Sequence, residues 1–478
     1  MPNAGDSSVR FHRDKLWRNW AGTQSCTPAV TYYPQTLNDL VEIVLLARRA
    51  GHHVRAVGRG HSMGPLSVTD GSLVVMDGLN RIGPIDTRRC EVTIESGVTI
   101  GALDRALRRT GLAVPTNVVL TSVQYGGVIA TGCHGAGWDR PTLSDLVEAM
   151  TVVTHDGTVV RFSEATHGPE VMNSVRCCLG TIGLIYDFTL RVEPLSRQVA
   201  VDRRLPMAAA EDPAQLASLL SGNEYMEVFW FPTSEGLWFK SWNSTSDPVP
   251  RVRLARAPLT LAPRALASTL IGNTAGRRAM QRLPGMTPVV NKLLYRGIVP
   301  RNRTMVVDLN EAAHYRRFIE LMKVQILSFS VKIDPGFTNV TRAWRLVVDK
   351  VRDRAAKAGE YPLNLMLEMR PIRSSKVLLS PAFGQDDEHH CYFELISFTG
   401  TPGTTEFFNE VALAWMDIPE LSARPHWAKY FFDIPGIIPY IREAWGENLT
   451  AFAMIRDDLD PDRVFMNPAL TRIFYDED

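Results

Sequence analysis

Residues 126–137 read GGVIATGCHGAG, a run of five glycines separated by mostly small residues. So many glycines in one run indicate that something packs against bare backbone there. Residues 57–64 (VGRGHSMG) and 179–185 (LGTIGLI) have the same character, and the latter segment leads into an apolar run typical of a strand. Three such segments in one part of the chain predict a large, flat or phosphorylated ligand.

The rest of the composition is that of an ordinary globular protein. The chain has 478 residues, of which 45% are hydrophobic and 22% charged, enough for two or three domains. Its 52 basic and 51 acidic residues leave a net charge of +1, which predicts no attraction to nucleic acid or to an anionic membrane. The six cysteines include no CxxC pair, so neither a disulfide framework nor a metal site is expected.

The N-terminal residues carry no apolar stretch of the kind found in signal peptides, and no window of the chain is long and apolar enough to span a membrane. We therefore expect a cytoplasmic protein with reduced thiols.

Elements alternate densely over residues 1–195. Helical periodicity covers residues 37–50 and 100–110, and short β-like runs lie between and after them. Residues 245–300 are rich in proline, arginine and small residues, which predicts an irregular insertion. Strands and amphipathic helices return over residues 304–398, and a short aromatic-rich stretch begins at about residue 425.

Residues 57–64 allow three interpretations. Residues 60–64 satisfy G-x-S-x-G, in which Ser62 would be the nucleophile of a serine hydrolase, but that motif needs a helix directly after it and Pro65 with a loop follows. A dinucleotide-binding loop is rejected because the glycine spacing is one residue too long and no crossover helix fits behind it. The third interpretation is a flavin loop, whose backbone N–H groups bind a pyrophosphate while His61 carries the ring system covalently.

Further motifs support the flavin interpretation. Residues 17–22 (WRNWAG), 368–370 (EMR), 424–429 (RPHWAK) and 459–465 (LDPDRVF), taken in order with the three glycine-rich segments, resemble the vanillyl-alcohol oxidase superfamily. The resemblance is strongest to its aldonolactone and alditol oxidases, the group of L-gulono-1,4-lactone and D-arabinono-1,4-lactone oxidases. It implies an α+β fold with a PCMH-type FAD-binding domain built from two α/β subdomains. A cap or substrate domain with an antiparallel sheet flanked by helices would complete it.

The resemblance also implies the domain limits. We expect the FAD-binding domain over residues 1–195, the cap domain over residues 196–424, and a C-terminal segment, residues 425–478, that returns to the FAD domain.

The cofactor site follows from the same resemblance. FAD is expected, bonded covalently to His61, with Cys133 as either a small apolar filler or a second point of attachment. The residues expected to bind the cofactor are Arg59, Gly60, His61, Ser62, Met63, Ser122, Gly127, Thr131, Gly132, Cys133, His134, Gly135, Ile185 and His426.

Three residues are expected to carry the chemistry. Glu368 and Arg370 lie in residues 363–370, an apolar run that is typical of a strand, and positions i and i+2 of a strand share a face. The plainer interpretation is a surface ion pair, whereas the resemblance implies that the pair binds and polarises a substrate hydroxyl above the flavin. Lys429 would place its charge near the flavin's N1, or would simply be a solvated residue at a helix end.

These observations predict two-electron oxidation of an alcohol or lactone hydroxyl carbon, with hydride transfer to flavin N5 and O₂ or another electron acceptor. Residues 116–120 (TNVVL) include β-branched side chains where oxidases of the family keep a small one, so both an oxidase and a dehydrogenase remain open as interpretations.

The expected partners are a small-molecule alcohol and the electron acceptor, and the expected oligomeric state is a monomer or homodimer. The apolar residues of 245–300 favour a larger hydroxylated metabolite over a simple polyol, unless that insertion only packs. The alternatives are the serine hydrolase and a flavoprotein that cyclises or rearranges its substrate.

Overall fold

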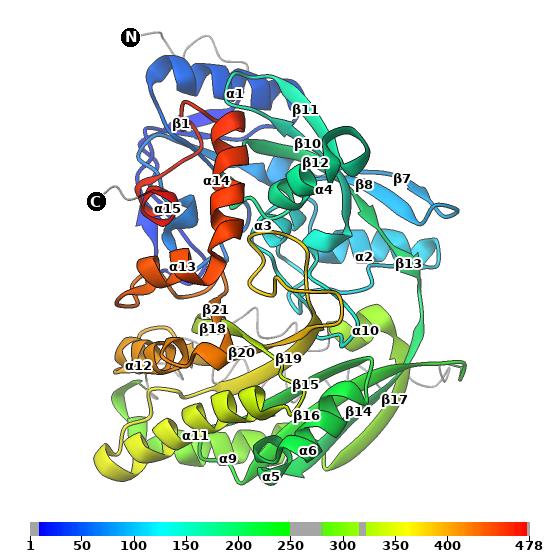
Figure 1. Cartoon of the computed structure of the whole chain (residues 1–478), viewed down its shortest axis with the longest axis vertical. Helices are drawn as coiled ribbons and strands as arrows, with labels where there is room; N and C mark the ends of the chain where they lie inside the picture. Colours follow the sequence, from blue (N-terminus) through cyan, green and yellow to red (C-terminus); the bar gives the residue numbers. More distant parts are fainter. Residues whose placement is uncertain (1–8, 249–277, 279–280, 315–321, 476–478) are drawn as a thin grey trace.

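The chain folds into two halves that meet along a broad junction. The computed structural model describes residues 9–248, 278, 281–314 and 322–475, so most of the predicted insertion at 245–300 lies outside the described residues. In Figure 1 the upper half contains the N-terminal part of the chain together with the C-terminal helices, and the lower half contains the middle of the chain.

A small mixed sheet and its helix begin the upper half. Strands β1 (Phe11–Arg13), β4 (Val30–Tyr32), β6 (Ser72–Val75) and β5 (Val54–Val57) are hydrogen-bonded in that order, and β4, β6 and β5 run parallel. Helix α1 (Leu37–Ala50) connects β4 to β5. Its first turn is closed by a capping box between Thr36 and Asp39, and it ends at Gly51, whose φ of 68° favours glycine.

An antiparallel sheet forms the remainder of the upper half. Its order is β11 (Val159–Ser163), β10 (Val147–Val153), β12 (Leu184–Arg191), β8 (Glu91–Glu95) and β7 (Ile82–Asp86). The helices of this part are α2 (Ile100–Arg109), α3 (Tyr125–Ala130) and α4 (Glu164–Val175). Short elements complete it: β2 (Trp17–Arg18), β3 (Ser25–Cys26), β9 (Leu112–Ala113), β13 (Glu193–Pro194), and the 3₁₀ turns η2 (Pro65–Ser67), η3 (Met76–Gly78) and η4 (Ser144–Leu146).

The lower half is built on one eight-stranded antiparallel sheet. Its order is β17 (Asn302–Asp308), β14 (Arg197–Pro206), β16 (Gly236–Thr245), β15 (Tyr225–Trp230), β19 (Met366–Arg373), β20 (His389–Phe398), β18 (Val324–Lys332) and β21 (Arg424–Pro425). Helices α11 (Thr338–Ala358), α5 (Ala208–Glu211) and α6 (Pro213–Ser221) pack together on one side of it (Figure 1). The other elements are α9 (Thr287–Ile298), α10 (Leu309–Ala313), α12 (Thr404–Met416), η6 (Pro284–Met286) and η8 (Pro419–Leu421).

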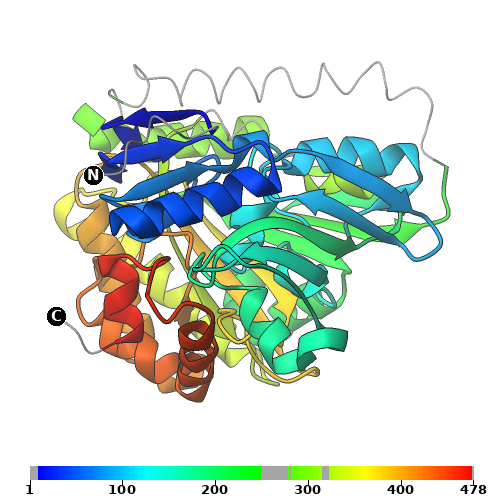
Figure 2. The same cartoon turned by 90° about the horizontal axis from the view of Figure 1, so that it is seen from above.

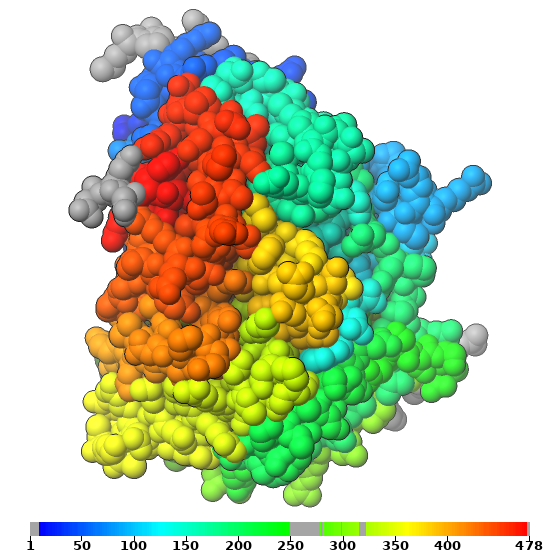
Figure 3. Space-filling model, viewed as in Figure 1, coloured from blue at the N-terminus to red at the C-terminus, as the bar shows by residue number. Residues whose placement is uncertain are grey.

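The C-terminal segment returns to the upper half. Helices α13 (Ile437–Trp445), α14 (Glu447–Leu459) and α15 (Pro468–Phe474) lie beside the N-terminal elements in both ribbon views (Figures 1 and 2). Asn467 ties the segment there, because its side-chain amide donates to the carbonyls of Pro65 and Val68 at 2.9 Å. In the space-filling view this orange-to-red segment lies directly on both halves (Figure 3).

The α+β class is confirmed, and helices form at 37–50 and 100–109 as the periodicity predicts. The division expected at 195/196 falls between β13 and β14. The strand expected within residues 363–370 begins later, at Met366, and runs to Arg373. Ser62 is followed only by the 3₁₀ turn Pro65–Ser67, so the helix that a hydrolase elbow requires is absent from this described stretch.

One buried arginine connects the distant segments of the upper half. Arg55 of β5 is 2% exposed, and its guanidinium donates to the carbonyls of Leu66 (2.7 Å), Gly180 (2.8 Å), Leu179 (2.6 Å) and Phe465. Burial lowers the pKa of Arg55 to about 10, which still leaves it charged at neutral pH. The side chain therefore satisfies four carbonyls from three separate parts of the chain.

We expect Arg55→Met to lower the free energy of unfolding by about 3–5 kcal/mol, because it leaves these buried carbonyls without donors. Urea unfolding followed by circular dichroism measures the loss. The exposed Arg49→Met on α1 is the matched control and should change stability by about 0.5 kcal/mol or less. Equal losses in the two variants would contradict the connecting role of Arg55.

Candidate active site

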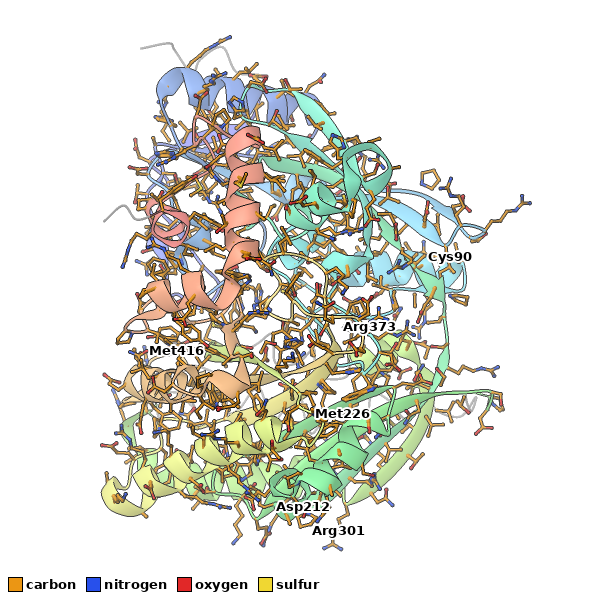
Figure 4. All side chains as sticks on the ribbon, in the orientation of Figure 1. Cys90, Asp212, Met226, Arg301, Arg373 and Met416 are labelled. Carbon is orange, nitrogen blue, oxygen red and sulfur yellow. The ribbon has the colours of Figure 1, made fainter. Side chains whose placement is uncertain are left out.

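A large cavity runs between the two halves. It contains about 1870 Å³ of space free of protein atoms, part of it open to solvent. Arg373, at the end of β19, lies at the level where the halves meet (Figure 4), and its backbone N–H donates to the carbonyl of Arg140 at 3.0 Å. The three glycine-rich segments and strands β18, β19 and β20 all contribute to its lining.

The glycines of this region serve two different purposes. A Cβ atom on Gly126 would lie 2.9 Å from the carbonyl oxygen of Ser96, and one on Gly135 would lie 2.3 Å from Oγ1 of Thr116, so these positions allow close packing of protein on protein. A Cβ on Gly127 would meet no protein atom within 4 Å, and Gly127 lines the cavity. Its bare backbone therefore faces open space, as a bound flat cofactor requires.

His61 is held at the cavity wall by the loop that carries it. Gly60 has φ of 67°, and its carbonyl accepts from the N–H of Trp20 at 2.7 Å. The ring of Trp20 stacks on the imidazole of His61 with the centroids 4.7 Å apart and the planes 17° apart. Met63, two residues after His61, connects this loop to the C-terminal segment, because its N–H donates to the carbonyl of Ala428 at 3.0 Å. The histidine loop and the 426–429 turn are thus adjacent.

Four charged side chains from β19, β20 and the 426–429 turn meet in the lining of the cavity. Nε of Arg370 lies 2.9 Å from Oε1 of Glu368, and Nη2 of Arg370 lies 2.8 Å from Oε2 of Glu394. The ammonium of Lys429 lies 3.4 Å from the other oxygen of Glu394. Two carboxylates and two cations leave the cluster formally neutral, and Glu368, Arg370 and Glu394 are all buried.

The electrostatics of this cluster favour the ionised form of Glu394. Burial raises the pKa of the Glu394 carboxyl, but the charges of Lys429 and Arg370 outweigh that effect and hold the pKa well below its usual value. Burial, reinforced by Lys429, lowers the pKa of His426 to about 3. Burial and the nearby Arg370 likewise lower the pKa of His134 far below its usual value. Both histidines are therefore neutral at physiological pH.

The neutral rings of His134 and His426 pack beside the cluster of four charged side chains. His134 stacks on Tyr392 with centroids 3.5 Å apart, and Tyr392 is the cross-strand partner of Arg370. Nδ1 of His426 accepts from the N–H of Ala428 at 3.0 Å, which closes the turn that presents Lys429. Aromatic stacking and a tight turn thus set the direction of the two cations.

Most of the residues predicted from the sequence meet at this cavity. Those that line it are Arg59, Gly60, His61, Ser62, Met63, Gly127, Thr131, Cys133, His134, Ile185, His426, Glu368, Arg370 and Lys429. Ser122, Gly132 and Gly135 do not line it; Gly132 (φ 63°) packs on Cys177. Glu368 and Arg370 share a face as predicted, and their burial excludes the surface ion pair. The Lys429 side chain is only 21% exposed, and the residue follows a turn, so it is no solvated helix end.

Cys133 lies in the cavity wall beside Thr131, with Sγ and Oγ1 3.5 Å apart. Burial raises the pKa of the Cys133 thiol, so it stays protonated at neutral pH. This favours the filler interpretation of Cys133 over an attacking thiolate. Val118, Val119 and Leu120, from the segment predicted to bear on oxygen access, also line the cavity.

Glu394 was missed from the sequence. It lies opposite Glu368 on the neighbouring strand, in a register that only strand pairing reveals. The available signal was a lone acidic residue inside the apolar run Cys391–Phe398, where an unpaired charge would be costly.

Comparisons with known proteins agree with this arrangement. Residues 28–163 match the family model described as FAD binding domain, and residues 189–473 match the model described as D-arabinono-1,4-lactone oxidase. The chain belongs to the D-arabinono-1,4-lactone oxidase family. The predicted class is thereby confirmed as an FAD-dependent oxidoreductase that acts on CH–OH groups.

Relatives of the D-arabinono-1,4-lactone oxidase family match the chain nearly end to end. L-gulono-1,4-lactone dehydrogenase of Mycobacterium tuberculosis is 29% identical, over 96% of this chain and 99% of that protein. L-gulonolactone oxidase of Scyliorhinus torazame is 27% identical, over 96% and 98%. The fold is shared with the crystal structure of cholesterol oxidase from B. sterolicum, with a TM-score of 0.79 at 17% identity over 99% of both chains.

The cavity also fits FAD on its own evidence, through the exposed backbone of Gly127 and the open space beside it. We expect Gly127→Ala to lower the flavin content of purified protein at least about tenfold, since the methyl group would occupy cofactor space. Thermal stability of the flavin-free protein should hold or rise, because alanine favours helix α3. Absorbance at the flavin bands and a melting curve measure both quantities.

Gly126→Ala is the matched control for that substitution. Its Cβ would press on the Ser96 carbonyl, so it should lower the melting temperature of the flavin-free protein itself. Full flavin content in Gly127→Ala would contradict the assignment of the Gly127 backbone as a cofactor-binding surface.

Proposed function

We propose that this chain oxidises a secondary alcohol carbon of a lactone-like or larger cyclic substrate, with FAD bonded to His61. The observation that carries the proposal is the meeting of Glu368, Arg370, Glu394 and Lys429 with the glycine-rich loops around one cavity. The relatives support the reaction, oxidation of a CH–OH group on a ring, since they are named as aldonolactone oxidases and dehydrogenases.

When bound, FAD supplies a two-electron oxidant that accepts hydride from a carbinol carbon. Arg370 binds and polarises the substrate hydroxyl, and its own direction is set by carboxylates on both sides. We assign the role of proton acceptor to Glu368, because the neighbouring cations hold the pKa of the Glu394 carboxyl too low for an efficient general base. Lys429 lies at the cavity wall, where its ammonium group would offset the negative charge that a bound flavin gains on reduction.

The resemblance to the family supports attachment through His61, which lines the cavity with its ring stacked on Trp20. That stack fixes the plane of the imidazole and therefore the direction of its ring nitrogens.

We expect acid-precipitated wild-type protein to keep its flavin absorbance in the pellet, because a bond to His61 survives unfolding. The variant His61→Ala should release any flavin to the supernatant, and the exposed His12→Ala should behave as wild type. Wild-type flavin released by acid would contradict the covalent bond while leaving FAD binding intact. Protein expressed with ample riboflavin that holds no flavin would contradict the oxidoreductase proposal as a whole.

The aliphatic part of the cavity wall favours a narrower class of substrate. Part of the described cavity wall is aliphatic, formed by Met322, Val324, Ile326, Leu365, Met366 and Ile396. A polyhydroxylated substrate would leave buried hydroxyls without partners against such a wall, at a cost for each. We therefore propose a hydroxylated ring with an apolar body, rather than a simple polyol.

Stopped-flow or acceptor-dye assays of flavin reduction test this preference. We expect kcat/KM for a 4-alkylcyclohexanol to exceed that for L-gulono-1,4-lactone and to rise about fourfold per added methylene, since each buried CH₂ contributes about 0.8 kcal/mol. Met366→Gln should flatten that rise, whereas the distant, exposed Met454→Gln should not. A higher kcat/KM for the polyhydroxylated lactone would overturn the apolar specification and leave the oxidation chemistry in place.

A further inference from the structure

Large apolar side chains on the surface are concentrated on one helix. The described residues include seven large hydrophobic side chains that are strongly exposed, and four of them lie between positions 283 and 293. These four are Leu283 (60% exposed), Met286 (47%), Val289 (51%) and Leu293 (66%). Their spacing places them along one side of η6 and α9, the patch that we call the α9 face.

The opposite side of the same helix is already occupied. Val290, Leu294 and Tyr295 pack into the apolar cluster of the lower half, and the amide of Asn291 donates to the carbonyl of Pro232 at 3.0 Å. Helix α9 is thus anchored through one side and still apolar on the other. When a helix is apolar on both sides and one of these sides is exposed to solvent, the exposed side is a candidate surface for a further contact.

The segment of the chain that carries the α9 face contains charges of one sign only. Residues 278–307 contain six basic residues and no acidic residue, and the whole stretch 248–307 contains eleven basic and none acidic. The rest of the chain holds 41 basic and 51 acidic residues, so the net charge of +1 averages over two unlike regions. The absence of attraction to anionic membranes that we predicted from net charge therefore does not apply to this region.

The basic side chains flank the apolar ones. Arg282 and Lys292 are exposed beside Leu283 and Leu293, and Arg296 is exposed one turn further on, with Glu235 at 2.8 Å. Arg301 extends away from the body of the molecule at the same end (Figure 4). Arg303, in the same stretch, is instead paired with Asp202 at 2.5 Å.

We propose that the α9 face docks on the surface of an anionic phospholipid bilayer. An exposed apolar strip bordered by arginine and lysine matches an interfacial helix, whose apolar side chains enter the acyl boundary while the cations meet lipid phosphates. Among the described residues no helix is long and apolar enough to cross a membrane. The proposal stands independently of the substrate.

Vesicle co-sedimentation of the full-length flavoprotein tests the proposal. We expect binding to phosphatidylcholine vesicles with about 25% phosphatidylglycerol at about 50 mM NaCl, at least about tenfold weaker binding to pure phosphatidylcholine, and weakening at about 500 mM NaCl. The double variant Val289→Ser/Leu293→Ser should lower the partition coefficient at least about tenfold. Arg282→Gln/Lys292→Gln should lower binding to the anionic vesicles and leave the weak binding to pure phosphatidylcholine unchanged.

The matched control is Val159→Ser/Met454→Ser, which removes two similarly exposed apolar side chains from β11 and α14, away from α9 (Figure 1). It should bind as wild type, with all variants showing wild-type circular dichroism and flavin content. Absence of wild-type binding, or an equal loss in the control, would overturn the proposal. A wild-type dimer that Val289→Ser/Leu293→Ser converts to monomer, without vesicle binding, would assign the α9 face to a second copy of this chain instead.

Discussion

The arrangement of the upper half depends on the Arg55 guanidinium. Its partners are carbonyls from the turn after the histidine loop, from the third glycine-rich segment and from the C-terminal segment. A buried charge is tolerated only when its donors are satisfied, so each of these segments is constrained to one position. Arg55 also lines the cavity, and the same interaction that organises the fold therefore shapes the site.

A second constraint acts at the junction of the halves. Strands β19 and β20 pair so that Glu368 lies opposite Glu394, and the like charges of two buried carboxylates would repel strongly without cations nearby. Arg370 contacts both carboxylates, and Lys429 contacts Glu394 from the 426–429 turn. A hydrogen bond from the backbone N–H of Met63 connects the 426–429 turn to the loop that carries His61. Charge balance in the lower half is thus connected to the position of His61 in the upper half.

Local patterns were sufficient for much of the site. The period of two along β19 placed Glu368 and Arg370 on one face, and glycine density marked the three segments that line the cavity. Glu394 could not be inferred in this way, because its partner lies 24 residues away and the pairing depends on strand register. The roles of the glycines also differed: Gly132 and Gly135 turned out to pack on protein, while Gly127 faces the cavity.

The amino-acid sequence by itself determined the family, the α+β class, the order of the motifs and the extremes of local charge between residues 248 and 307. These are properties of short segments, and periodicity, glycine content and residue type express them without reference to distant parts of the chain. The tertiary structure alone decided that Arg55 joins three segments, that a second buried carboxylate, Glu394, lies between two cations, and that α9 leaves an apolar side in water. Those features arise from contacts between residues far apart in the chain, and only the packed fold brings them together.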